Sequence, residues 1–103
     1  FFFGASANFM EAMSVVAVKK PKVIILRMRH VPLIDATGLH VLKSEYKNAK
    51  KSGVAFVLSG VRPGLFELLE KAELVALIGH ENIVADIDKA LERAKQILKS
   101  EGL

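Results

Sequence analysis

Residues 22–29 read KVIILRMR, and this run of adjacent aliphatic side chains decides the fold class. An uninterrupted β-branched run behind a breaker, here Pro21, is typical of a strand that is buried on both faces of a parallel sheet. Residues 54–58, VAFVL, form a second run of this kind. We therefore expect the two runs to pair, with Ile25 and Val57 on adjacent strands. The side chains expected in the core are Ile24, Ile25, Leu26, Val54, Phe56 and Val57.

Helical periodicity separates and follows these strands. A first helix is expected from about residue 9 to Pro21, and a second from its N-cap Asp35 to about Ser52, where Gly53 allows a left-handed stop. A short third helix is expected over residues 65–72. The last helix has one apolar face, formed by Ile87, Ala90, Leu91, Ala94, Ile97 and Leu98.

The predicted order is βαβαβα with an additional C-terminal helix, which defines an α/β fold with a mostly parallel sheet and flanking helices. The first strand in this order is Phe1–Phe3, which is too short to stand alone. We therefore expect residues 1–103 to form a single domain whose initial strand or strands are missing. The first, second and last helices are expected to pack against the sheet.

The composition argues against several classes of site. The chain has no cysteine, which removes disulfides and thiolate chemistry. Its three histidines, His30, His40 and His80, are scattered without metal-ligand spacing, so we expect no metal and no cofactor. The chain also lacks an apolar run of the roughly 20 residues that cross a bilayer.

The net charge of +4 could indicate a nucleic-acid partner, but the distribution of the lysines does not favour one. The densest basic group occupies one side of the predicted helix 35–52, opposite its apolar positions, as expected for a solvated face. Its members are Lys43, Lys47, Lys50 and Lys51, and they lie opposite Leu39, Leu42, Tyr46 and Ala49. We therefore expect no nucleic acid.

The candidate site is the turn DATG at residues 35–38, because ligands of open parallel sheets bind at the carboxyl ends of the strands. If Asp35 is the N-cap, Thr37 lies in the first helical turn, where a phosphate or a partner carboxylate would be stabilised. The alternative is that Asp35 only caps, Thr37 faces water and Gly38 packs closely. The loops at Pro32, Ser59 and Arg62 are expected to flank this turn.

Four segments carry a resemblance to a known family. Residues 31–40, VPLIDATGLH, resemble the signature loop of STAS domains, most closely in the SulP permease branch. Residues 2–5, 69–74 and 78–83 are similar to other segments of SulP tails and occur in the same order. The resemblance implies a non-catalytic regulatory domain at the cytoplasmic face of the cell (inner) membrane, as part of an anion transporter. Its partner would be the membrane domain of the same transporter or a cytosolic regulatory protein.

A soluble anti-sigma-factor antagonist is the alternative within the same fold. In these relatives the loop reads Asp-Ser-Ser-Gly and its second serine is the phosphorylated switch, a place that Thr37 occupies here. Ala36 stands in place of the first serine, which favours the transporter branch. Nucleotide binding, attributed to some members, has no support in a phosphate-cradling Gly-rich loop. The chain also lacks a convincing nucleophile and base for an enzyme.

Overall fold

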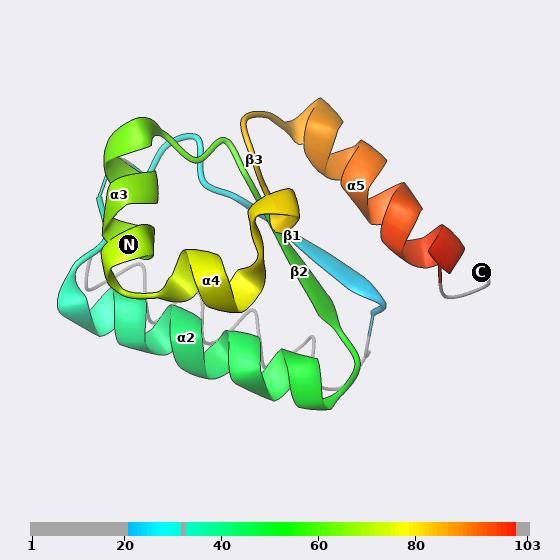
Figure 1. Ribbon diagram of the computed structural model, residues 1–103, viewed down its shortest axis with the longest axis horizontal. Helices are drawn as coiled ribbons and strands as arrows, with labels where there is room; N and C mark the ends of the chain where they lie inside the picture. Colours follow the sequence, from blue (N-terminus) through cyan, green and yellow to red (C-terminus); the bar gives the residue numbers. More distant parts are fainter. Residues whose placement is uncertain (1–20, 32, 101–103) are drawn as a thin grey trace.

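The computed structural model describes residues 21–31 and 33–100, and within these ranges a parallel sheet forms the centre of the domain. Its strands are β1 (Val23–Arg27), β2 (Ala55–Ser59) and β3 (Ile83–Val84), in the spatial order β1-β2-β3 (Figure 1). The central strand β2 pairs in parallel with both neighbours. The predicted parallel α/β architecture is confirmed.

The helices follow the strands in the predicted alternation. They are α2 (Ala36–Lys51), α3 (Pro63–Lys71), α4 (Leu74–Ile78) and α5 (Ile87–Ser100), with a short 3-10 turn, η1 (His80–Asn82), before β3. In the described ranges no helix is long and apolar enough to cross a membrane. The predicted strand 1–3 and the helix ending at Pro21 lie outside the described residues.

Three elements were not predicted from the sequence: α4, η1 and β3. The helix α4 has five residues and β3 has two, so both are shorter than the window over which periodicity can be recognised. α4 starts after Glu73, which has a left-handed φ of 64°. Tertiary contacts therefore define these elements: β3 exists because Leu58 and Ser59 of β2 pair with it.

β1 and β2 pair in parallel over their whole length. Ile25 lies opposite Val57, and the ladder continues to Arg27 opposite Ser59. Beyond the strand, the N–H of Met28 donates to the carbonyl of Ser59 at 2.7 Å, which extends the pairing past the end of β1. The prediction that Ile25 and Val57 lie on adjacent strands is confirmed.

Helices cover both faces of β2. Phe56 contacts Tyr46 of α2 edge to face, with ring centroids 5.7 Å apart, and Leu58 belongs to the same core cluster as residues of α3 and α4. Because successive strand residues point to opposite faces, Val57 and Ser59 point away from this cluster. The helix α5, whose Ala90 is fully buried, packs against β1 and β2.

The predicted core side chains are buried in β2 and at Val54, which precedes it, but less fully in β1. Val54, Phe56 and Val57 are buried, as predicted. The β1 side chains Ile24, Ile25 and Leu26 were also predicted to be buried, and they are only half-buried, with Ile24 and Leu26 packed against the core cluster. In the described sheet β1 has a strand neighbour on one side only, whereas β2 is paired on both sides.

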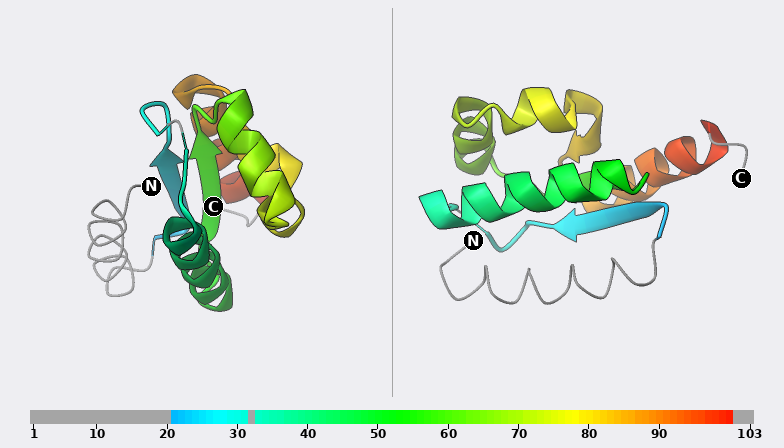
Figure 2. Two further views of the ribbon diagram at one scale, coloured as in Figure 1. Left: turned by 90° about the vertical axis from the view of Figure 1, so that its left-hand side faces the viewer. Right: turned by 90° about the horizontal axis from the view of Figure 1, so that it is seen from below.

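A hydrogen bond joins α2 to α4, which lie beside each other (Figure 2). The hydroxyl of Tyr46 donates to the carbonyl of Leu77 at 2.9 Å, while the Tyr46 ring packs on Phe56. The Tyr46 side chain therefore connects the short α4 to the sheet through a single residue of α2.

We expect Tyr46→Phe to lower the free energy of unfolding by about 1–2 kcal/mol, because the Leu77 carbonyl loses its hydroxyl donor in a partly buried place. Urea denaturation followed by circular dichroism measures the change. Ser100→Ala is the matched control: its hydroxyl also donates to a carbonyl, that of Ile97, but at an exposed helix end where water can replace it. Equal losses in the two variants would contradict this role of Tyr46.

Candidate functional site

The start of α2 is held by a side-chain cap. Asp35 has extended backbone angles, φ −80° and ψ 173°, and its Oδ1 accepts a hydrogen bond from the N–H of Gly38 at 2.7 Å. Its carbonyl accepts the bond from Leu39 at 2.9 Å. The predicted N-cap is therefore confirmed, and the turn 35–38 has a defined geometry.

The cap determines what this turn presents to a partner. Asp35 and Thr37 are exposed, whereas Gly38 is buried. Since the Gly38 N–H already donates to Asp35, it is not free for an external anion. The exposed polar side chains of the turn are thus the Asp35 carboxylate and the Thr37 hydroxyl, both at the positive end of the helix dipole.

The other predicted site residues occupy different positions. Arg62 is exposed and immediately precedes α3, and its side chain makes no capping bond. Ser59 is only 2% exposed and points to the face of the sheet opposite to the one that α2 covers. Pro32 lies outside the described residues. The structure therefore groups Asp35, Thr37 and Gly38, while Ser59 belongs to another surface.

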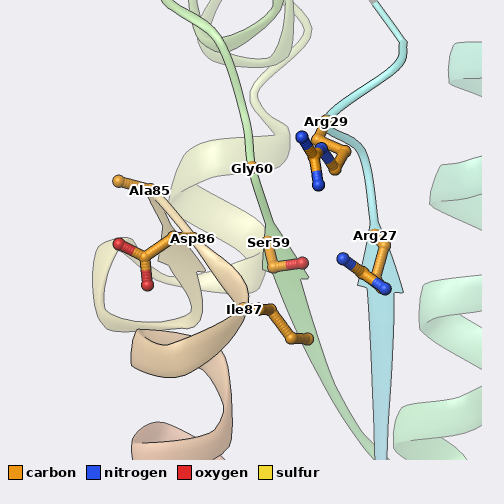
Figure 3. A pocket seen from close by; sticks show the side chains of 7 residues that line it. All are labelled: Arg27, Arg29, Ser59, Gly60, Ala85, Asp86 and Ile87. Atoms are coloured by element: carbon orange, nitrogen blue, oxygen red, sulfur yellow. The ribbon is translucent and has the colours of Figure 1, made fainter.

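That second surface is a pocket of about 340 Å³ at the carboxyl ends of the strands, next to the start of α5 (Figure 3). Its lining includes Arg27, Arg29, Ser59, Gly60, Asp86 and Ile87. Apart from Ser59, the sequence analysis missed these residues. The available signal was the alternation of Arg27 and Arg29 at the end of a strand, which places two arginines on one side.

Gly60 brings the walls of this pocket together. Its φ is +71°, and an added Cβ would lie 2.9 Å from the Cβ of Arg29 and 3.0 Å from its Cα and N. The Gly60 N–H donates to the carbonyl of Val84 at 3.0 Å. This residue thus allows the chain after β2 to approach β1 closely while remaining bonded to β3.

His30, His40 and His80 are all exposed, and the described part of the chain contains no group of three or more His, Cys, Asp or Glu side chains that could hold a metal ion.

Comparison with known proteins supports the architecture described above. The family model of the STAS domain matches residues 1–90. The chain belongs to the STAS domain family. The predicted resemblance is confirmed, and the match covers the strands β1 to β3 and the capped turn of α2.

Solved structures of this family superpose on nearly the whole domain. A sulfate transporter family protein from Wolinella succinogenes is 39% identical with a TM-score of 0.89, covering 96% of this chain and 80% of that one. A SulP transporter STAS domain from Vibrio cholerae is 30% identical with a TM-score of 0.80, covering 97% and 77%.

Curated relatives are named as sulfate transporters. Sulfate transporter 1.3 of Arabidopsis thaliana is 29% identical over 88% of this chain, which spans 14% of that protein. High affinity sulfate transporter 1 of Stylosanthes hamata is 32% identical over 66% of this chain, which spans 10% of it. The STAS domain thus corresponds to a small part of these relatives.

Replacement of Gly60 should be more destabilising than replacement of Gly53, which has a similar φ but free space around an added Cβ. Gly53 has φ +76° with nothing within 4 Å of an added Cβ, so Gly53→Ala should cost about 1–2 kcal/mol for the left-handed backbone alone. Gly60→Ala adds the contact with the Arg29 backbone, and should cost at least about 1 kcal/mol more. Chemical denaturation of both variants tests this difference, and equal costs would contradict the close approach.

Loss of the Asp35 carboxylate should destabilise α2. We expect Asp35→Ala to lower the free energy of unfolding by about 1 kcal/mol, and Asp35→Asn to retain most of it, because an amide oxygen can also accept the Gly38 N–H. Asp88→Ala is the control: it removes an equal charge from the first turn of α5, where another residue, Asp86, provides the cap. The urea midpoints of the three variants measure the effect. Equal midpoints for Asp35→Ala and Asp88→Ala would contradict the capping role of Asp35.

Proposed function

We propose that this STAS domain is the cytoplasmic regulatory and protein-interaction domain of a SulP-type anion transporter, at the inner face of the cell membrane. The observation that carries the proposal is the superposition of nearly the whole chain on a SulP transporter STAS domain, with a TM-score of 0.80. The names of the curated relatives agree with it, and the domain spans only 14% of the first of them. The remaining length of such a protein would supply the membrane part, where selectivity for the anion would reside.

The domain is proposed to act without catalysis of its own. The carboxylate nearest to a hydroxyl in the candidate turn, Asp35, is engaged with the Gly38 N–H as a cap. The nearby histidines His30 and His40 are exposed, without the buried setting that tunes a catalytic base. These features support a role in binding rather than in turnover.

We propose that partners dock on the turn at the start of α2. Asp35 and Thr37 are exposed there, and the Asp35 cap holds the turn in one conformation before a partner arrives. A preordered surface loses less conformational entropy on binding than a flexible loop. The partner would be the membrane domain of the same transporter or a cytosolic regulatory protein.

The exposure of Thr37 in the first turn also suits a phosphorylated switch, as in an anti-sigma-factor antagonist. A phosphate there would be favoured by the helix dipole. The transporter relatives make this the second candidate. The gene upstream of the codon for Phe1 distinguishes the two, because a permease requires several apolar spans of about 20 residues and an antagonist requires none.

A negative charge at Thr37 should weaken docking without unfolding the domain. We expect Thr37→Glu to reduce association with the membrane domain by about 1–3 kcal/mol, because a docked surface accepts an unpaired charge poorly. The fold should tolerate it, since the charge lies at a helix N-terminus. Transport by the full-length protein in vesicles and the melting temperature of the STAS domain are the two measurements.

Asn48→Glu provides the control for the added charge, because Asn48 is exposed in the last turns of the same helix, away from the candidate turn. This variant should keep transport at the wild-type level. If Thr37→Glu and Asn48→Glu both leave transport and every partner interaction unchanged in well-folded protein, the turn is only a helix cap.

A further inference from the structure

The pocket beside the start of α5 contains cationic side chains that lack internal partners. The guanidinium groups of Arg27 and Arg29 line the pocket, and neither forms an ion pair or a side-chain hydrogen bond with any residue in 21–31 or 33–100. An adjoining hollow of about 280 Å³ is lined by the same two arginines and His30. Two unpaired guanidinium groups in one concave surface favour an anionic occupant.

Ser59 is a second and independent indication of a ligand. The residue is 2% exposed, yet its hydroxyl has no hydrogen-bond partner among the described residues. No described side-chain oxygen or nitrogen is both fully shielded and unbonded, so the Ser59 hydroxyl must reach the pocket surface. In Figure 3 it points to the side on which Arg27 and Arg29 lie. A ligand in the pocket would accept a hydrogen bond from this hydroxyl in place of water.

The start of α5 adds backbone donors at the same place. Asp86 caps this helix: its Oδ1 accepts the N–H of Lys89 at 2.9 Å, and its carbonyl accepts that of Ala90 at 3.1 Å. The N–H groups of Ile87 and Asp88 have no backbone partner among the described residues. The Asp86 carboxylate points away from the arginines in Figure 3, so it does not neutralise them by direct contact.

We propose that this pocket binds a tetrahedral oxyanion, phosphate or sulfate, between Arg27, Arg29 and Ser59. The arginines supply charge and paired N–H donors, the Ser59 hydroxyl donates from the floor, and the helix start supplies a positive dipole. The volume of about 340 Å³ is at the lower end of the roughly 300–1,000 Å³ typical of small-molecule sites. The pocket has room for an inorganic ion or for the phosphate group of a small metabolite. In both cases the bound group is a tetrahedral oxyanion.

This inference does not depend on the docking surface, because the pocket and the turn at Thr37 involve different residues on opposite faces of the sheet. Binding to the pocket is measured on the 103-residue chain without any partner. A negative result here would leave the proposed function intact, and a failure of docking at Thr37 would leave the pocket intact.

Titration with sodium phosphate and with sodium sulfate, followed by amide NMR shifts at constant ionic strength, tests the proposal. We expect saturable shifts at Ser59, Gly60, Ile87 and Asp88, and no saturation with chloride. Arg27→Gln should weaken binding by about tenfold or more, because a charge-assisted contact is lost. Lys47→Gln removes the same charge from the exposed face of α2, and should stay within about twofold of the wild type because the distant charge is screened.

Ser59→Ala separates a ligand contact from a structural role. Because the hydroxyl has no internal partner, its removal should leave the melting temperature unchanged while weakening oxyanion binding roughly tenfold. Glycerol 3-phosphate distinguishes the two sources: tighter binding than inorganic phosphate assigns a small organic phosphate, and equal or weaker binding assigns the free ion. The proposal is overturned if no saturable shift occurs, if Arg27→Gln and Lys47→Gln behave alike, or if Ser59→Ala binds as the wild type does.

Discussion

The parallel pairing of β1 with β2 is the constraint on which the rest of the domain depends. It places Ile25 opposite Val57 and brings the carboxyl ends of both strands to one edge of the sheet. Because β2 is central and covered on both faces, its hydrogen bonds and side chains are removed from water together. The loops that follow β1 and β2 must then emerge at this edge, and the turn of α2 and the arginine pocket both lie there.

The two faces of the sheet have different roles. On one face Phe56 and Leu58 belong to a core that includes residues of α2, α3 and α4. Tyr46 of α2 contacts Phe56 and donates a hydrogen bond to the carbonyl of Leu77 in α4. On the other face α5 packs against β1 and β2 with Ala90 fully buried, while Leu91 remains 48% exposed. The turn of α2 and the arginine pocket are therefore supported by one scaffold but can act separately.

The capped turn could be predicted because its signal is local. The pocket could not, because it joins residues from distant segments. Asp35 followed by Gly38 three residues later is a pattern within one turn, and the bond between them is formed by neighbours in the chain. Ser59 was singled out from the sequence, but as a neighbour of Asp35. Successive residues of β2 point to opposite faces of the sheet, and this decides whether Ser59 faces α2 or α5. The sequence analysis placed Ser59 in a loop, where no such alternation applies.

The sequence by itself determined the α/β class, the two buried-type strand runs, the capped helix and the family resemblance, because these depend on periodicity and on contacts within a few residues. Only the tertiary structure decided that β3 exists, that β1 is half-buried, and that Arg27, Arg29 and Ser59 share a pocket. Each of these depends on contacts between distant segments, such as Gly60 against Arg29 and Gly60 bonded to Val84. Such contacts follow from the packing of the whole chain and leave no periodic pattern in any one segment.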